Sequence, residues 1–349
     1  MTVHIHGLAI AQAAHDLPQD LVRQRAERVL GPRFPHFARM LGSFDQAGIE
    51  RRRSVAPLDW FDDAAHGWAE RNALWLDGCR GMFREAARGA LNEAGWRGAD
   101  VDVVVTVTST GIATPTLDAQ EAAALGLRPD AMRVPVFGLG CAGGASGLAL
   151  AADLARARPG ARVLLVVVEA CTVSFRTDRL TKADIIATVL FGDGAAAACL
   201  STEGDAAITV GRGLQHRWPD TLGIMGWDVE DTGLGVVFDR SIPDFARSEI
   251  AAATDSALAT AGLARDGFDG LICHPGGAKV VAALESAFGL PNGTLGVERD
   301  VLRDHGNMSA PTVLFVLDAA RRTGRCGKQL LMALGPGFTA SYVPLEMAA

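Results

Sequence analysis

Three residues in distant parts of the chain have the types and local settings that acyl-transfer chemistry requires. Cys141 lies in the run Phe137-Gly-Leu-Gly-Cys-Ala-Gly-Gly-Ala-Ser146, where an apolar strand is expected to give way to a helix of small residues. Unpaired backbone N–H groups and the positive end of a helix dipole can lower a cysteine pKa from about 8.5 to roughly 3.5–7.5. His274 and Asn307 each lie in a glycine-containing turn that is expected to open a helix.

Together these residues can supply the parts of an acyl-transfer site, namely a nucleophile, a group that manages the proton and donors for the developing oxyanion. We expect backbone N–H groups around Cys141 and Ala142 to complete the oxyanion hole. Taken singly, each residue also has a structural explanation, because buried cysteines are usually core residues and Asn or His side chains cap turns and helices. The combination favours a Cys/His/Asn acyl-transfer site.

The same glycine-rich segment formally satisfies the pattern G-x-G-x-x-G at 138–143, and Glu169 ends the following predicted strand. This is the dinucleotide-binding fingerprint of an oxidoreductase. The motif falls in mid-chain, however, Cys141 would press on the pyrophosphate, and His274 and Asn307 would have no role. The oxidoreductase and a non-catalytic α/β module are therefore the alternatives to acyl transfer.

The elements that must position these residues follow an α/β pattern. Strands are predicted at 101–108 and 162–169, each after an alanine-rich helix, at about 82–94 and 142–157. The second half repeats the pattern with a strand at 270–274, helices at 277–288 and 308–322, and a strand at 329–334. The fold class predicted is α/β with a largely parallel sheet.

The two halves also match each other along the chain, since Asp318 and Arg321 repeat Asp153 and Arg156 at the same offset. We therefore expect an N-terminal half, 1–205, that carries the nucleophile and a C-terminal half, 206–349, that carries the His and Asn. A duplicated βαβ unit would bring both helix starts to one central site at the carboxyl ends of strands.

Composition excludes several classes of protein. The 349 residues are 49% hydrophobic and only 6% aromatic, which predicts a large core of Ala, Val and Leu. The net charge of −7 offers no global attraction to nucleic acid or anionic membrane, although Arg51, Arg52 and Arg53 with Arg39 can form either a phosphate-binding patch or a solvated face. Six scattered cysteines without CxxC pairs argue against zinc and a disulfide framework, and the lack of a signal peptide or long apolar segment predicts a cytoplasmic protein.

Several short motifs occur in an order typical of one family: Gly140-Cys-Ala-Gly-Gly144, Gly160-Ala-Arg-Val163, Ser174-Phe-Arg176, Leu190-Phe-Gly-Asp-Gly-Ala195, His274-Pro-Gly-Gly277, Gly306-Asn-Met-Ser309, Val313-Leu-Phe315 and Gly335-Pro-Gly337. Over nearly its whole length the chain resembles the type III polyketide synthases, the chalcone and stilbene synthase-like enzymes of the thiolase fold. Ketoacyl-ACP synthase III, the alternative condensing enzyme, shares the fold and the Cys/His/Asn chemistry. Its usual His-Gln-Ala-Asn stretch is absent here, which favours CoA thioesters over carrier-protein substrates.

The resemblance implies a thiolase-like fold of two fused halves, with sheets sandwiched by helices in αβαβα order. It also implies that Cys141 takes a starter acyl group from an acyl-CoA, while His274 and Asn307 bind malonyl-CoA as it loses CO₂. The resulting enolate would attack the acyl-Cys141 thioester, and repeated extension would be followed by cyclisation. Neither a metal nor another cofactor is implied, and the partners are the acyl-CoA and malonyl-CoA substrates and a second copy of the chain in a homodimer.

Further positions are carried over from the family as substrate-binding residues. Phe191 matches a gatekeeping aromatic, a second gatekeeping Phe of plant members is replaced by Val236, and Thr114 falls near the dimer interface. The full set comprises Arg39, Ser109, Thr110, Thr114, Cys171, Ser174, Phe191, Val236, Ser309, Gly335, Pro336 and Gly337. Val236, together with Trp218-Pro-Asp-Thr221 and Met225-Gly-Trp227, resembles bacterial members that use fatty-acyl starters. The expected products are therefore long-chain alkylpyrones or alkylresorcinols.

Overall fold

A computed structural model describes residues 1–34, 36–62, 66–179 and 181–349. Within these ranges ten strands form one mixed sheet, in which β9 (Leu214–Arg217) pairs with β14 beside the main path. The main path runs in the order β12 (Gly270–Cys273), β13 (Gly327–Gly335), β14 (Thr339–Met347), β8 (Ile208–Val210), β1 (Val3–Gln12), β7 (Asp193–Ser201), β6 (Val163–Ala170), β4 (Val103–Val107) and β5 (Met132–Val136).

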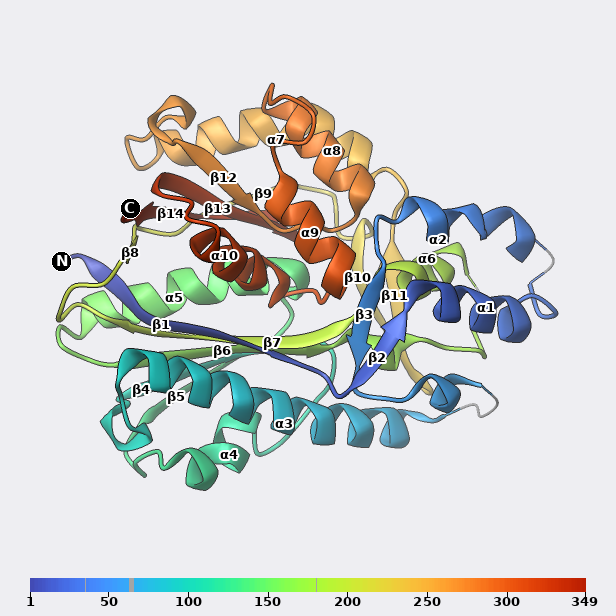
Figure 1. Cartoon of the computed structure of the whole chain (residues 1–349), viewed down its shortest axis with the longest axis horizontal. Helices are drawn as coiled ribbons and strands as arrows, with labels where there is room; N and C mark the ends of the chain where they lie inside the picture. Colours follow the sequence, from blue (N-terminus) through green and yellow to red (C-terminus); the bar gives the residue numbers. More distant parts are fainter. Residues whose placement is uncertain (35, 63–65, 180) are drawn as a thin grey trace.

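Short strand β8 joins the two halves of this sheet, because it pairs with β1 on one side and β14 on the other. Helices form three layers that alternate with the two halves of the sheet, which gives the expected αβαβα arrangement (Figure 1). The order of the helical layers is α3 (Trp68–Ala94) with α4 (Leu117–Leu125), then α5 (Gly143–Ala157) with α10 (Thr312–Arg322), then α7 (Ile242–Ala259) with α8 (Ala278–Ala287).

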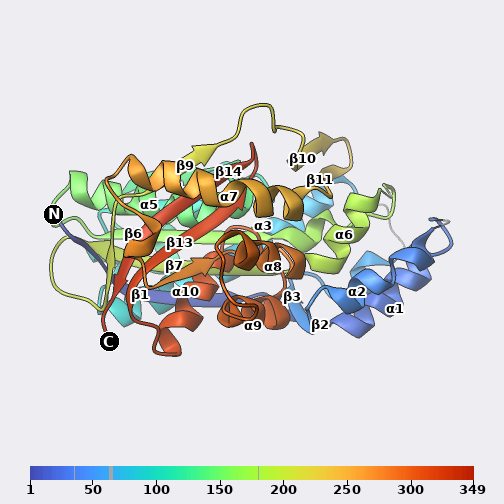
Figure 2. The same ribbon diagram turned by 90° about the horizontal axis from the view of Figure 1, so that it is seen from above.

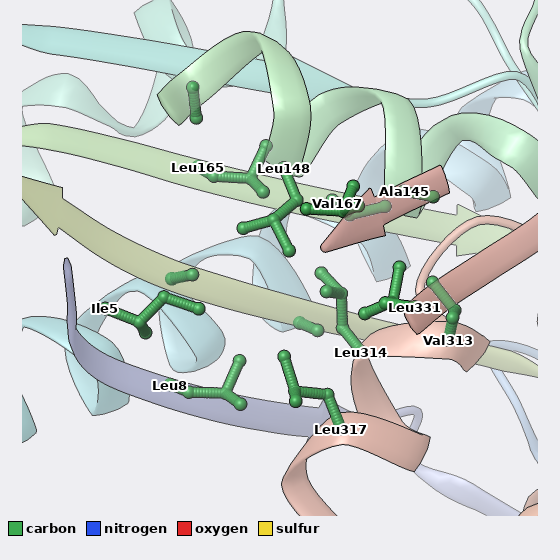
Figure 3. Packing of buried hydrophobic residues seen from close by; sticks show 14 of the residues in the cluster. Ile5, Leu8, Ala145, Leu148, Leu165, Val167, Val313, Leu314, Leu317 and Leu331 are labelled. Atoms are coloured by element: carbon green, nitrogen blue, oxygen red, sulfur yellow. The ribbon is translucent and has the colours of Figure 1, made fainter. Parts of the chain in front are cut away.

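The middle layer contains the largest core of the described residues. Ala145 and Leu148 of α5 pack with Leu314 of α10 between the two halves of the sheet, as Figure 3 shows. The glycines at the start of α5 allow this helix to approach the turn before α10 closely. A Cβ on Gly144 would lie 2.2 Å from the Ala310 carbonyl oxygen. The low aromatic content of the sequence is thus compatible with dense packing of helices on sheets.

The strands predicted from apolar runs are confirmed. β6 is buried along its whole length and pairs in parallel with β4, and β12 pairs in parallel with β13. Strands buried on both faces are expected to be continuously apolar, which explains why the runs at 101–108 and 162–169 were informative. The sheet is nevertheless mixed, because β7 is antiparallel to both β6 and β1, and β14 is antiparallel to β13.

The repeat between the two halves is visible in the middle layer. On α5 Arg156 pairs with Asp153 at 2.8 Å, and on α10 Arg321 pairs with Asp318 at 2.7 Å. Each arginine also donates a hydrogen bond to a strand carbonyl, which belongs to β8 for Arg156 and to β1 for Arg321. The two helices thus dock on the sheet through equivalent arginine contacts.

Helix α10 begins later than its sequence predicts. The expected start was at residue 308, but Ser309 has a positive φ of 59° and Thr312 is the first helical residue. Conversely, the helix predicted at about 82–94 extends back to Trp68. The segment between Asn307 and α10 is therefore a turn, and Asn307 does not cap the helix.

A peripheral group of elements packs at one end of the molecule (Figure 2). It contains the paired strands β2 (His15–Pro18) and β3 (Arg51–Ser54), the hairpin β10 (Met225–Glu230) and β11 (Gly233–Phe238), and the helices α1 (Gln19–Leu30), α2 (Gly42–Gln46) and α6 (Lys182–Leu190). Helix α9 (Gly296–His305) leads into the Asn307 turn. Among the helices in the described residues, none is long and apolar enough to cross a membrane.

Candidate active site

The nucleophile candidate lies between a strand and a helix, as expected. β5 ends at Val136, Cys141 is the middle residue of the 3-10 turn Gly140–Ala142, and α5 follows at once. The loop before Cys141 is fastened by Ser109, whose hydroxyl accepts hydrogen bonds from the N–H groups of Gly138 and Gly140, each at 3.2 Å. Gly140 has a positive φ of 46° and packs on Pro336, so a larger residue does not fit there.

His274 follows β12 directly and continues its pairing with β13, because its N–H donates to the Met332 carbonyl oxygen at 2.9 Å. The side chain is only 5% exposed. Both ring nitrogens are buried and lack a hydrogen-bond partner in the described part of the chain. Such a group is costly unless a ligand engages it, which is typical of a functional site.

Asn307 is held by a backbone bridge between the two halves of the chain. Its N–H donates to the Leu190 carbonyl oxygen at 2.8 Å, and its own carbonyl oxygen accepts from Gly192 at 3.0 Å. The side-chain Oδ1 accepts from the Ser309 N–H at 2.8 Å, and Nδ2 donates to the Gly276 carbonyl oxygen at 3.1 Å. The amide is thus oriented by the segments that carry His274 and Phe191.

Two small cavities meet at Cys141. The first, of about 20 Å³, brings Cys141 together with His274 and Asn307, and the remainder of its wall is mainly apolar. The second, of about 30 Å³, has a wall that includes Cys141 and several of the residues predicted to bind substrate, namely Cys171, Phe191, Val236, Ser309 and Pro336. We call them the catalytic cavity and the acyl cavity, and the fold thus joins residues from both halves of the sequence.

Burial controls the charge states of the catalytic pair. It raises the pKa of the Cys141 thiol to about 11, an effect that outweighs hydrogen bonds from Ser309, Asn307 and the Cys141 N–H. It also lowers the pKa of His274 to about 4. Burial thus favours the neutral thiol and the neutral imidazole, and at Cys141 it opposes the lowering of the pKa expected from the backbone N–H groups and the helix dipole.

The expected oxyanion donors are also partly corrected. The Ala142 N–H is already used, since it donates to the Leu139 carbonyl oxygen at 3.1 Å within the 3-10 turn. The Cys141 N–H faces its own thiol, whose pKa it lowers. The oriented Asn307 amide and the unpartnered His274 ring are thus better placed to polarise a carbonyl in the catalytic cavity.

Glu169, the acidic residue of the dinucleotide-binding fingerprint, is part of the buried scaffold near the Cys141 loop. It is fully buried, and its Oε2 accepts hydrogen bonds from the Thr110 hydroxyl at 2.7 Å, the Ser109 N–H at 2.9 Å and the Thr108 hydroxyl at 3.2 Å. Burial raises its pKa to about 7. Because the N–H groups of the glycine-rich loop are also occupied, the dinucleotide alternative is not supported.

Several residues predicted to bind substrate form hydrogen bonds within the scaffold. Ser109 fastens the Cys141 loop, Thr110 bonds Glu169 and the Ala170 N–H, and the Ser174 hydroxyl donates to the Cys171 carbonyl oxygen at 2.7 Å. Gly335 and Gly337, which flank Pro336, allow this loop to pack closely on its neighbours. A Cβ on Gly335 would lie 2.6 Å from the Leu139 carbonyl oxygen, and Gly337 has a positive φ of 66°.

The remaining predicted contacts lie at the surface. Arg39 and Thr114 are both exposed and line neither cavity. The arginine run does not form a phosphate patch, because Arg52 is completely buried and donates to the carbonyl oxygens of Thr188, Val189 and Phe191. Its neighbours Arg51 and Arg53 pair with Asp16 instead.

Other residues of the site were missed at the sequence level. Trp227, with Met225 and Phe238 on the β10–β11 hairpin, lines the acyl cavity, and its ring makes an edge contact with Phe191 at 6.2 Å between centroids. An apolar hairpin with a Trp was visible in the sequence, but nothing local tied it to Cys141. Trp218, which was grouped with it, instead packs on Phe245 and Phe338 in the core.

A groove at the surface borders the catalytic cavity. It has a volume of about 340 Å³ and shares Phe238, Gly276 and Val280 with that cavity. Its wall also carries the cationic residues Lys182, Arg240 and Lys279.

A Cys, a His and an Asn that meet between the two halves of a thiolase-like fold define a condensing acyltransferase. The chain belongs to the chalcone and stilbene synthases, the type III polyketide synthases, because the family's N-terminal domain model matches residues 62–204 and its C-terminal domain model matches residues 210–346. Enzymes of this family are decarboxylating condensing acyltransferases. The carrier-protein-dependent alternative is therefore not retained.

Individual relatives agree with this family. A 1,3,6,8-tetrahydroxynaphthalene synthase of Streptomyces peucetius is 39% identical over 313 residues, which cover 86% of this chain and 81% of the relative. The type III polyketide synthase domain of Steely1 from Dictyostelium is 25% identical, with a TM-score of 0.93 over 100% of both chains. The structure of CsyB complexed with CoA-SH is 26% identical, with a TM-score of 0.90 over 99% of this chain and 100% of CsyB.

Proposed function

We propose that this protein builds a polyketide on Cys141 by repeated decarboxylative condensation of malonyl-CoA onto an acyl-CoA starter. The observation that carries the proposal is the convergence of Cys141, His274 and Asn307 on one cavity that a surface groove borders. In the first step the thiol proton passes to His274 as the sulfur attacks the starter thioester. The acyl–sulfur bond to Cys141 forms, the bond to CoA breaks and the CoA thiolate takes a proton.

Proton transfer to His274 resolves the conflict between burial and reactivity. Burial disfavours either charge alone, since it raises the Cys141 pKa and lowers the His274 pKa. A thiolate beside an imidazolium is stabilised by their mutual attraction in a site of low dielectric constant. We therefore infer that the nucleophile forms when substrate excludes water, and not in the resting enzyme.

The extension step uses the same cavity. His274 and Asn307 hold the thioester carbonyl of malonyl-CoA, the bond to its carboxylate breaks, and CO₂ leaves while the electron pair passes into an enolate. Donors already oriented toward the developing charge are the main source of stabilisation for such a species. The enolate carbon then attacks the acyl-Cys141 carbonyl, and the Cys141 thiolate leaves.

The groove and its cationic residues support CoA thioesters as substrates. Lys182, Arg240 and Lys279 would meet phosphates at the surface, and the pantetheine arm would pass Phe238 and Gly276 to reach Cys141. In the related CsyB structure the bound molecule is CoA. Replacing Lys279 with Ala should raise the KM for acyl-CoA and leave the maximal rate largely unchanged.

The starter that we propose is a fatty-acyl CoA, and the product an alkylpyrone or alkylresorcinol. The support is Val236, whose small side chain leaves the acyl cavity without an aromatic ring at that position. A second candidate is a small starter such as malonyl-CoA itself, with a fused aromatic product. The contact of Trp227 with Phe191 favours it, because the bulky pair leaves a cavity of only about 30 Å³.

Product analysis decides between these two candidates. The purified protein would be supplied with malonyl-CoA alone and with an acyl-CoA panel from about two to about 16 carbons, with products identified by mass spectrometry. Alkylated products from long starters would support the fatty-acyl proposal. Aromatic product from malonyl-CoA alone would support the second candidate, and no condensation with any substrate would contradict the proposed chemistry.

We also propose a homodimer that forms around β5. The edge strand β5, which carries the exposed Met132, lies beside a hollow of about 380 Å³ whose wall includes the exposed apolar side chains of Ile112 and Phe137. Exposed apolar patches of this kind mark protein–protein interfaces. Phe137→Asp should therefore convert a dimer to monomers in sedimentation velocity, and a wild-type protein that sediments as a monomer would contradict the proposal.

A further inference from the structure

The β10–β11 hairpin forms one wall of both cavities, although it is not part of the ten-stranded sheet. Met225 and Trp227 on β10 and Val236 and Phe238 on β11 all line the acyl cavity, and Met225 and Phe238 also line the catalytic cavity. An isolated two-stranded hairpin is marginally stable in water. Its position over Cys141 must therefore depend on contacts with the body of the protein.

A cluster of charged side chains supplies such a contact at the turn end of the hairpin. Glu230 is the last residue of β10, and its Oε2 accepts from Arg176 Nη1 at 2.7 Å while its Oε1 accepts from Arg179 Nη1. Arg176 also donates to Asp178 and to the hydroxyl of Thr232, and Thr232 donates to Asp178 at 2.7 Å. We call these five residues the Glu230 clamp.

The clamp is anchored to the body of the protein. Arg71 of α3 donates to the carbonyl oxygens of Val173, at 2.5 Å, and Phe175, at 2.8 Å, directly before Arg176. The Arg176 side chain is only 3% exposed. Arg176 is paired with Asp178 as well as with Glu230, so loss of the Glu230 carboxylate would release the hairpin from a guanidinium that stays in place.

The hairpin is shaped to fit the clamp. A Cβ on Gly235 of β11 would lie 1.7 Å from Nη1 of Arg179, so a larger residue at this position would require the guanidinium to shift. The same guanidinium lies 3.4 Å from Asp184 of α6 and 3.6 Å from Asp228 of β10. Arg179 therefore connects the hairpin to α6, the helix that leads into Phe191.

We propose that Glu230 is a positioning residue for acyl-chain selection, because the clamp sets how closely Trp227 and Val236 approach Cys141 and Phe191. This inference rests on the proposed acyl-binding role of the cavity. When the clamp is weakened, the hairpin moves away from the cavity and longer acyl groups fit. His274 and Asn307 lie on other elements, so the decarboxylation of malonyl-CoA stays intact.

The test compares Glu230→Gln with two related variants of the full chain. Glu230→Asp keeps the charge and should restore most of the wild-type behaviour. Glu93→Gln is the matched control, because Glu93 is exposed to a similar degree, 40% against 36%, and pairs with Arg321 away from both cavities. Each variant is measured for hydrogen exchange in β10–β11, for kcat/KM across an acyl-CoA series and for malonyl-CoA decarboxylation.

For Glu230→Gln we expect amide exchange in β10–β11 to rise by about tenfold, since a local opening has become easier. The ratio of kcat/KM for the longest to the shortest starter should rise by about fivefold or more, with decarboxylation changed by less than about twofold. Glu93→Gln should show none of these changes. Hydrogen exchange in β10–β11 does not depend on catalysis. A wild-type protein without condensing activity would therefore contradict the proposed function, and the exchange of Glu230→Gln would still test whether the clamp holds the hairpin.

Two results would overturn the proposal. In the first, Glu230→Gln keeps the wild-type exchange in β10–β11 and the wild-type starter profile. In the second, kcat/KM for every starter and the rate of decarboxylation fall by the same factor in Glu230→Gln, and Glu230→Asp shows the same loss. This result would indicate a general structural role for Glu230.

Discussion

The two cavities at Cys141 differ in how their walls are built. The catalytic cavity takes His274 from the end of a central strand and Asn307 from a backbone bridge between the halves, so its polar groups are fixed by the main sheet. The acyl cavity takes Trp227 and Val236 from a hairpin outside that sheet. The polar residues of the proposed chemistry thus lie on the main fold, whereas the proposed acyl site is closed by a separate hairpin, which also contributes Met225 and Phe238 to the catalytic cavity.

Replacement of Cys141, which lines both cavities, should have the largest effect on condensation. Cys141→Ala removes the sulfur on which the acyl group is carried, so condensation should fall by more than about 10³-fold. Mass spectrometry of the intact protein after incubation with acyl-CoA would show no adduct. Cys326→Ala, which removes the exposed thiol, serves as the control. An undiminished condensation rate in Cys141→Ala would contradict the assignment of the nucleophile.

Asn307→Ala should affect the catalytic cavity alone. Malonyl-CoA decarboxylation should slow by about 10²–10³-fold, the usual cost of one oxyanion donor, while the starter still loads on Cys141. Release of CO₂ and the acyl-enzyme mass are measured separately. Asn307→Asp keeps an oxygen to accept the Ser309 N–H but loses the amide donor, so it separates the catalytic role from the structural one. If this variant decarboxylates normally, Asn307 acts only through the turn.

Val236→Phe should affect the acyl cavity alone. The added ring fills apolar volume, and since each lost methylene contact is worth about 1–3 kcal/mol, long starters should lose at least about tenfold in kcat/KM relative to short ones. Decarboxylation serves as the internal measure of intact chemistry. Val229→Phe on the same hairpin is the control, because Val229 is 80% exposed. An unchanged chain-length profile would show that residue 236 does not limit the starter.

The last prediction concerns the charge state of the Cys141 thiol. Because burial raises the pKa of Cys141 to about 11, its thiolate fraction should increase about tenfold per unit between about pH 6 and pH 9. The alkylation rate of Cys141 by iodoacetamide should follow this increase and exceed the rates of the other buried thiols, which do not line the catalytic cavity. A rate independent of pH in this range would indicate a thiolate–imidazolium pair already present without substrate.

The main elements of the fold were predictable because their sequences are locally distinctive. β6 and β4 are apolar on both faces, and α5 is rich in small residues, so burial and packing leave few alternatives. The start of α10 was not predictable. Ser309 adopts a left-handed conformation that the backbone bridge at Asn307 imposes, and this bridge involves Leu190 and Gly192, more than 100 residues away.

The residues predicted to bind substrate also differ in how far the sequence indicates their surroundings. Phe191, Cys171 and Val236 line the acyl cavity, whereas the hydroxyls of Ser109 and Thr110 form hydrogen bonds within the scaffold. A motif places a residue on an element, but the direction of a short polar side chain depends on which partner lies nearest in space. Here the partners are the glycine N–H groups of the Cys141 loop and the buried carboxylate of Glu169.

The sequence by itself indicated the class of enzyme, since the combination of Cys141, His274 and Asn307 in an ordered set of motifs favoured acyl transfer over the alternatives. It also determined the duplicated α/β layers, through apolar runs and the repeated Asp and Arg on α5 and α10. Only the tertiary structure decided the charge state of the thiol, because desolvation depends on everything packed around it. It also decided the size of the acyl cavity, because Trp227 and Cys141 line the same cavity only once the hairpin has folded against the body of the protein.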